Sequence, residues 1–231
     1  MAKAAKQAGD PAEGATRLPT HEVIYRQLRN QVLFGDLAPG QPVTIQGLTE
    51  RLGAGMTPVR EAIRRLIAEG ALEFQGNRRV CVPLLDTANI SELIFARQWL
   101  DPHLALRATE RVTLAELDQL TLMDDAHDLA IAQGDLRAYL ELNYRFHTRI
   151  YGIADSPILA ELAEGLWLRF GPSLRVVCGR MGTQNLPDKH KTILEAMHAR
   201  DGERAARAIR EDVIQGMEQV RQSFELSGGA R

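Results

Sequence analysis

Apolar residues recur every three or four positions along most of the chain, which is typical of amphipathic helices. The first helix is predicted from residue 21, and two shorter helices follow at 44–53 and 57–70. The spacing then changes to alternation, so residues 71–74 and 80–82 are expected to form strands on either side of a tight turn. Three helices followed by a hairpin predict a winged helix-turn-helix.

Residues that favour helix ends mark both short helices. Thr44 is expected to cap the first of them, and Gly53 to end it. Thr57 is expected to cap the second, because the proline directly after it, Pro58, suits the first helical position. The apolar face of this second helix is predicted to be buried, and it comprises Val59, Ala62, Ile63 and Leu66.

The chain after residue 83 is predicted to be helical throughout. Six helices are expected, at 88–108, 113–132, 135–152, 157–180, 187–200 and 203–225. Residues 1–18 show no apolar period and are rich in alanine, glycine and lysine, so they are predicted to be a flexible tail. The fold class is therefore mainly α, with a winged helix-turn-helix domain at 19–85 and an all-α helical bundle at 86–231.

Composition places the chain among folded soluble proteins. Hydrophobic residues make up 45% of it and charged residues 25%, which is ordinary for such a protein. The two cysteines, Cys81 and Cys178, cannot form a disulfide framework. The N-terminus lacks the apolar core of a signal peptide, and no stretch approaches the roughly 18 apolar residues of a membrane span. We therefore expect a cytoplasmic protein with no membrane partner.

Charge is distributed unevenly. Residues 21–85 carry eight arginines and six acidic residues, whereas residues 86–231 are net acidic. A small basic domain joined to a larger acidic one suits a nucleic-acid reader with a separate control module. The helix from Thr57 fits this role, because Arg60 and Arg64 are four residues apart and share one face. The alternative interpretation is a small structural domain with solvated arginines.

The segment from Ile45 to Gly70 resembles the GntR family of bacterial transcription regulators, most specifically in Thr57-Pro-Val-Arg-Glu-Ala62. Gly55-Met56 stands where the family usually has Ser-Arg, so one customary DNA-contacting arginine is missing. One small reading head contacts too few base pairs for useful specificity, so we expect a homodimer on operator double-stranded DNA. The DNA-binding residues that the pattern and the resemblance imply are Gln46, Thr57, Arg60, Arg64, Asn77 and Arg78.

The helical half of the chain resembles the FCD ligand-binding domain of the FadR branch of this family, in its VanR-like subgroup. Two segments carry the resemblance, Arg97-Gln-Trp-Leu-Asp101 and Asn143-Tyr-Arg-Phe-His147, and His190 opens a third. The resemblance implies a domain for effector binding and dimerisation. The expected effector-binding residues are Arg97, Asn143, His147 and His190.

A metal site is implied by the same resemblance, because metal-binding members usually have Asp, His, His and His where this chain has Asn143, His147, His190 and Asp212. Asn143 and His147 share one helix face, and an antiparallel helical hairpin would bring His190 level with Asp212. We therefore expect one divalent transition metal, such as zinc, manganese or nickel. A neutral amide oxygen is a poor ligand, so Asn143 is expected to bind weakly or not at all.

Arg97 lies in line with an apolar stripe of its predicted helix, and a buried guanidinium needs a partner. Asp101, four residues further on, could provide it through an internal salt bridge. The other interpretation is a pocket arginine that receives the carboxylate of a small organic acid effector through two hydrogen bonds. The sequence leaves both interpretations open.

Together these features predict a sequence-specific DNA-binding transcription regulator, a repressor rather than an enzyme, controlled by a small carboxylate, a divalent metal or both. An alternative from another class is a metal-dependent hydrolase with an accessory DNA-binding-like domain, since two histidines and an aspartate could activate a water. Against it, the chain has no Ser/His/Asp order, phosphate loop or His-Glu-x-x-His helix. A third interpretation is an architectural DNA-binding protein without a ligand response.

Overall fold

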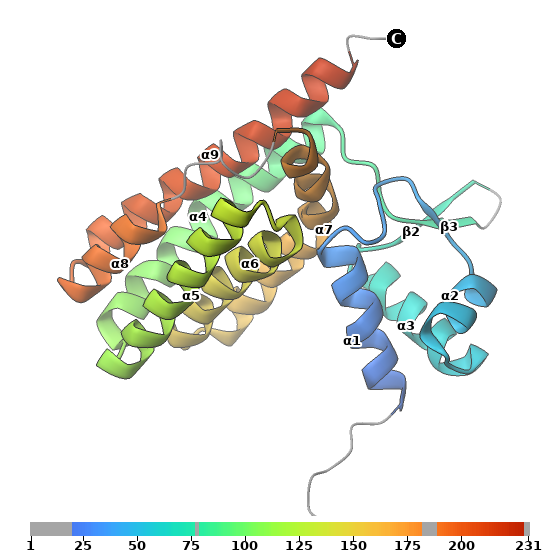
Figure 1. Cartoon of the computed structure of the whole chain (residues 1–231), viewed down its shortest axis with the longest axis horizontal. Helices are drawn as coiled ribbons and strands as arrows, with labels where there is room; N and C mark the ends of the chain where they lie inside the picture. Colours follow the sequence, from blue (N-terminus) through green and yellow to red (C-terminus); the bar gives the residue numbers. More distant parts are fainter. Residues whose placement is uncertain (1–19, 77–78, 182–188, 229–231) are drawn as a thin grey trace, which may run out of the picture.

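Three helices begin the part of the chain that the computed structural model describes, which is residues 20–76, 79–181 and 189–228. The elements of the N-terminal domain are α1 (Thr20–Leu33), β1 (Pro42–Val43), α2 (Ile45–Leu52), α3 (Met56–Ala68), β2 (Glu73–Gln75) and β3 (Arg79–Cys81). They form the predicted winged helix-turn-helix (Figure 1). Strand β1 is an addition to the predicted hairpin: it pairs antiparallel with β3, which gives the sheet order β1-β3-β2.

Helix α3 begins at Met56, and its N-cap is Gly55 rather than Thr57, so the predicted cap is wrong. Gly53 ends α2 in a left-handed conformation and Gly55 is extended, so the new helix starts two residues earlier than the proline indicates. Pro58 is tolerated in this first turn, because the first four N–H groups of a helix have no intrahelical acceptor. The side chain of Thr57 is exposed on the same turn.

The core of the N-terminal domain forms between α1 and α3, which pack against each other. All four apolar residues predicted to be buried on α3 are buried, and Leu28 and Val32 of α1 are fully buried. Thr44 caps α2 as predicted, because its side chain accepts a hydrogen bond from the backbone N–H of Gly47. The spacing of the apolar residues along α3 therefore determines which face of the helix is buried and which is exposed to solvent.

Six helices make up the described part of the C-terminal domain, and each end falls within three residues of the predicted one. Side chains at Asp86, Thr113 and Asp135 start three of them by accepting a backbone hydrogen bond from the first turn. Helix α9 packs against α4 and α8. The six are α4 (Thr87–Arg111), α5 (Leu114–Gln133), α6 (Leu136–Ile153), α7 (Pro157–Met181), α8 (His190–His198) and α9 (Gly202–Gly228).

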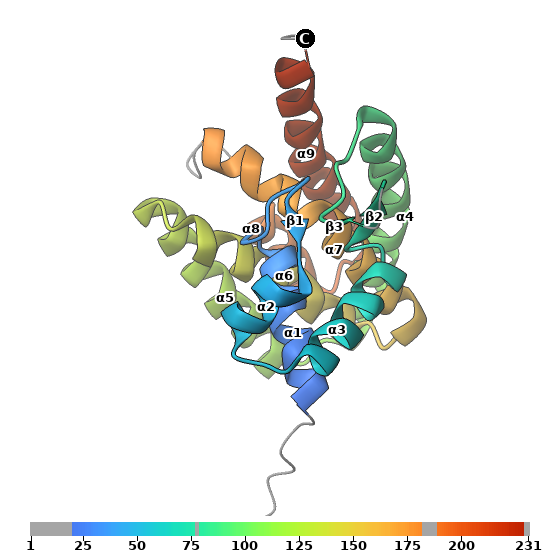
Figure 2. The ribbon, with the colours of Figure 1, turned by 90° about the vertical axis from the view of Figure 1, so that its right-hand side faces the viewer.

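The two domains meet where α1 packs against α7, and Figure 2 shows the N-terminal domain in front of the bundle. The ring of Phe34, just after α1, lies edge-on to Tyr144 of α6, with ring centroids 5.8 Å apart. Arg29 of α1 donates a hydrogen bond to the Tyr144 hydroxyl at 3.3 Å, and Asp36 forms an ion pair with Arg137. Tyr144 is therefore a contact of α6 with the N-terminal domain.

Gly171 of α7 lies so close to α1 that a Cβ atom there would be 2.2 Å from the carbonyl oxygen of Leu33. Gly171→Ala is therefore expected to lower the thermal midpoint, although alanine normally stabilises a helix interior by about 1 kcal/mol relative to glycine. Gly165→Ala in the same helix is the matched control and should raise the midpoint, because its Cβ would meet nothing within 4 Å. Equal stabilisation by both substitutions would show that α1 and α7 are not in contact at this point.

Candidate functional site

The outer face of α3 carries three of the residues predicted to contact DNA. Thr57, Arg60 and Arg64 are all exposed. Arg64 has a loose ion pair with Glu61 at 3.7 Å, and 76% of its side chain remains exposed, so water screens the pair and the guanidinium can exchange partners. The two arginines therefore present positive charge on the face of the helix that the core does not use.

The other predicted DNA contacts lie on α2 and at the hairpin. Gln46 is exposed on α2, where its amide nitrogen donates to Glu50 at 3.3 Å. Asn77 and Arg78 lie outside the described residues. Among the described residues, the predicted DNA contacts therefore lie on α2 and α3.

Arg65, the neighbour of Arg64, has a different role. It donates hydrogen bonds to Glu69 at 3.1 Å and to Glu22 of α1 at 3.0 Å. Its guanidinium also lies 3.5 Å from the ring centroid of Tyr25. These contacts join α3 to α1, so Arg65 is engaged within the domain.

His147 of α6, His190 at the start of α8 and Asp212 of α9 come together inside the bundle. Their ligand atoms all lie within 4.8 Å of one another. His147 Nε2 is 3.2 Å from Asp212 Oδ2, and the backbone N–H of Lys189 donates to Asp212 Oδ1 at 3.0 Å. The structure thus brings together three of the four residues that the resemblance assigns to a metal.

The protonation of this group suits metal binding. Burial lowers the pKa of His147, against the opposing effect of the nearby Asp212 carboxylate. Burial alone would raise the pKa of Asp212, but the hydrogen bond from His147 and the two imidazoles lower it overall. His147 Nδ1 is buried and has no hydrogen-bond partner among the described residues, which is uncommon for a buried polar atom. A neutral imidazole and an ionised carboxylate are the forms that bind a cation.

A cavity of about 40 Å³ adjoins the group, with Arg97, Asn143 and Asp212 on its wall. The buried Arg97 makes the internal salt bridge with Asp101, because its Nε and Nη2 atoms lie 3.1 and 2.6 Å from the same carboxylate oxygen. The other oxygen of Asp101 is buried without a hydrogen-bond partner among the described residues. The salt bridge that the sequence left as one alternative is therefore present, and the effector contact stays a prediction.

Trp167 of α7 connects this cavity to the domain boundary. The Arg97 guanidinium lies 4.5 Å from the Trp167 ring, and the His147 and Trp167 ring centroids are 5.2 Å apart. On its other side Trp167 meets Tyr144 edge-on at 5.6 Å. A continuous row of aromatic contacts thus runs from the cavity to the residue that touches α1.

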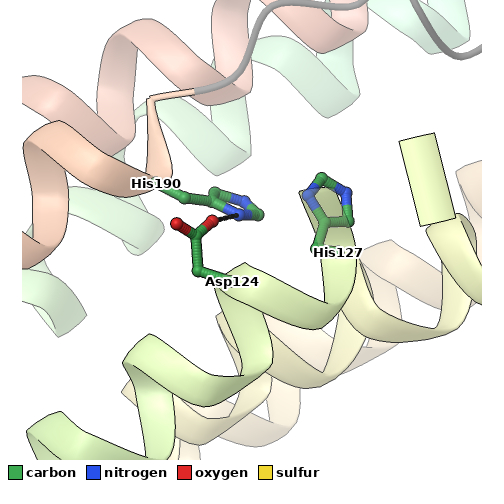
Figure 3. A group of neighbouring side chains, drawn as sticks. All are labelled: Asp124, His127 and His190. Atoms are coloured by element: carbon green, nitrogen blue, oxygen red, sulfur yellow. Dashed lines mark hydrogen bonds and ion pairs between the residues drawn. The ribbon is translucent and has the colours of Figure 1, made fainter. Parts of the chain in front are cut away.

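Sequence reasoning missed the contribution of α5. The carboxylate of Asp124 lies 3.1 Å from His190 Nδ1, and His127 lies beside them (Figure 3). The ligand atoms of Asp124, His127 and His190 also lie within 4.8 Å of one another. Burial lowers the pKa of His127 to about 4, and its ring stacks on Tyr139 at 4.8 Å. The spacing Asp-x-x-His on a predicted helix was the available signal, since residues three apart share a face.

Comparison with known proteins places the chain in a family. The model of the family described as "Bacterial regulatory proteins, gntR family" matches residues 20–82, and that of the FCD domain matches residues 92–214. The fold, a winged helix-turn-helix followed by a helical bundle, agrees with both. The chain belongs to the GntR family of bacterial transcriptional regulators, with a C-terminal FCD domain.

Two relatives from Escherichia coli K12 are similar over nearly the whole chain. The HTH-type transcriptional regulator McbR is 28% identical over 87% of this chain and 92% of its own length. The HTH-type transcriptional repressor RspR is 27% identical over 88% of this chain and 90% of its own length. Both are named as transcriptional regulators, which agrees with the family of this chain and gives no support to the hydrolase alternative.

Solved structures agree with this assignment. The structure of E. coli McbR/YncC superposes with a TM-score of 0.84 at 27% identity and covers 90% of this chain and all of that one. A putative GntR regulator from Rhodococcus sp. RHA1 shares the fold, with a TM-score of 0.73 at 18% identity over 88% of this chain and 98% of that one. None of the described helices combines the length and the apolar composition that crossing a bilayer needs.

Proposed function

We propose that this regulator binds operator DNA as a homodimer through the outer face of α3, and that a divalent metal, a small carboxylate or both, bound inside the bundle, change its affinity for DNA. The observation that carries the proposal is the convergence of His147, His190 and Asp212 in the domain joined to the DNA-reading helix. We assign DNA binding to residues 19–85, and effector binding and dimerisation to residues 86–231. Repression is proposed by analogy with RspR, and a cytoplasmic location because the operator lies there.

The donor set fits a divalent transition metal. Two imidazoles and one carboxylate would hold the ion, and Asn143, on the wall of the same cavity, would be a weak fourth ligand. Asp212 in place of a third imidazole favours a harder ion, such as manganese over zinc or nickel. The bound ion would supply a fixed positive charge able to hold water or an anionic effector.

The carboxylate is proposed because Arg97 lies on the wall of the cavity. A volume of about 40 Å³ has room for about one water molecule or a carboxylate group but not for a whole organic acid. A larger acid would have to open the cavity. Asp212 and Arg97 lie on the wall of the same cavity, so one carboxylate could contact both the guanidinium and a cation held by Asp212.

Operator affinity tests the proposal. Fluorescence anisotropy with manganese, zinc or nickel, with small mono- and dicarboxylates, and after chelation should show a Kd that depends on the additive. For the carboxylate, Arg97→Ala should abolish the response, while Asp101→Asn, which breaks the internal salt bridge but keeps the guanidinium, should preserve it. If no metal or carboxylate changes the Kd, the proposal is wrong and the protein is better described as an architectural DNA-binding protein without a ligand response.

The homodimer is proposed on α4 and α7, which pack on each other. Large apolar side chains are exposed on both helices, Phe95 and Trp99 on α4 and Ile158 and Leu162 on α7. Large exposed apolar side chains on two helices that pack together are a feature of interaction surfaces. A second copy of this chain is the partner that a two-fold symmetric operator requires.

Ile158→Glu is expected to convert the dimer to a monomer, because it places a charge in an apolar interface. Ile158 is 75% exposed in the single chain, so the substitution should not affect the fold. Leu122→Glu, on α5 and 67% exposed, is the matched control and should remain dimeric. Light scattering after size-exclusion chromatography measures the mass, and a dimeric Ile158→Glu variant would place the interface elsewhere.

A further inference from the structure

We propose that Asp124 is a positioning residue for the metal, which orients the imidazole of His190 and fixes its tautomer. The inference rests on the proposed metal site, because His190 is one of its ligands. Asp124 comes from α5, a helix that supplies none of the predicted ligands. Asp124 is 2% exposed, and its carboxylate lies 3.1 Å from His190 Nδ1 (Figure 3).

The chemistry of the pair fixes which ring nitrogen can bind a metal. An ionised carboxylate can only accept a hydrogen bond, so His190 Nδ1 must carry the proton that it donates to Asp124. A neutral imidazole with its proton on Nδ1 has its lone pair on Nε2. A carboxylate that accepts from one nitrogen of a histidine, while the other binds the ion, is a common arrangement around protein-bound metals.

Asp124 is itself held in place by the start of α8. Its second oxygen contacts the ammonium of Lys191 at 3.4 Å, and Lys191 also forms an ion pair with Asp128. On the opposite side the backbone N–H of Lys189 donates to Asp212 of α9. Three consecutive residues at the start of α8 therefore contact carboxylates on the two flanking helices, which limits how the His190 ring can turn.

A second cation held by Asp124, His127 and His190 is the competing interpretation, since their ligand atoms also lie close together. Two observations favour the positioning role. The Lys191 ammonium already contacts Asp124, so a cation there would be repelled by it. His190 Nδ1 faces Asp124 at hydrogen-bond distance, and a metal between them would have to replace that bond.

The experiment compares Asp124→Asn with Asp128→Asn, because both carboxylates contact Lys191 but only Asp124 contacts His190. Nitrogen-15 NMR of the metal-free protein reads the tautomer of His190 directly. An asparagine amide can donate to Nδ1, so Asp124→Asn should shift His190 toward the form with its proton on Nε2. Asp128→Asn should leave the tautomer unchanged.

The affinity for manganese and zinc, measured by competition with a chromophoric chelator, is the second readout. Asp124→Asn should weaken binding by about 10- to 100-fold. Asp128→Asn and His127→Gln should not weaken it. Asp124→Glu keeps the carboxylate, so it should restore part of the affinity and the Nδ1-protonated tautomer, and it also serves if the asparagine variant does not fold.

An unchanged tautomer in Asp124→Asn would overturn the proposal. An equal loss of affinity in His127→Gln would also overturn it, in favour of a cation at Asp124, His127 and His190. If the wild-type protein binds neither metal, the proposed metal control fails by itself. The NMR comparison, which uses no metal, then still decides whether Asp124 sets the tautomer of His190.

Discussion

Arg60→Ala is expected to abolish specific operator binding while leaving the fold intact. Arg60 is exposed on α3, on the face that the core does not use. A guanidinium on such a helix reads guanine or contacts phosphate, and its loss costs on the order of 1–3 kcal/mol per subunit. A homodimer loses the contact twice. Fluorescence anisotropy at fixed salt, with specific and non-specific DNA compared, measures the effect.

Arg65→Ala is the control on the same helix, because Arg65 contacts Glu22, Glu69 and the Tyr25 ring. It should lower the thermal midpoint, since it removes contacts between α3 and α1, and should leave the preference for operator over non-specific DNA unchanged. Arg60→Ala should show the reverse pattern. Wild-type operator affinity in Arg60→Ala would show that α3 does not read the operator through this residue.

His147→Gln is expected to remove the bound metal. The substitution keeps a polar side chain of similar size but takes one of two imidazoles from a site with three strong donors. The remaining imidazole and carboxylate leave too few ligands to retain a transition metal through purification. Elemental analysis of protein purified without chelator or metal-affinity tag should find about one divalent ion per wild-type chain and nearly none in the variant.

His103→Gln provides the control, because His103 is an exposed histidine on α4, away from the cavity residues. It should keep the wild-type metal content. A wild-type content near zero, unchanged after zinc, manganese or nickel is added, would contradict the metal site. His147 and His190 would then be ordinary buried polar residues of the bundle.

Most of the fold could be predicted because its determinants are local. Three helices of the bundle begin at side chains that cap them, Asp86, Thr113 and Asp135, and these residue types are readable from the sequence. The N-cap of α3 could not be predicted in this way. Gly53 ends α2 in a left-handed conformation and Gly55 is extended, so the helix begins before Thr57. Strand β1 has only two residues and exists through its pairing with β3, which lies far along the chain.

The candidate site likewise contains residues that could be predicted from the sequence and residues that could not. His147, His190 and Asp212 could be proposed because the resemblance and the hairpin of α8 and α9 relate them by sequence position. Asp124 could not, because its contact with His190 depends on how α5 packs against α8 across 66 residues of chain. Tyr144 is a similar case, since its role arises only where the two domains touch.

Helix α6 carries both a residue of the proposed metal site and a residue that contacts the N-terminal domain. His147 contacts Asp212 and Tyr144 contacts Phe34 and Arg29, yet His147 and Tyr144 lie three residues apart, which is about 4.5 Å along a helix axis. In the proposed function, a ligand that moved His147 would be expected to move Tyr144 as well, because the two residues lie on adjoining positions of one helix turn. Tyr144 contacts Phe34 and Arg29, and α1 packs against α3, so on the proposed function such a movement would reach the helix that carries Arg60 and Arg64.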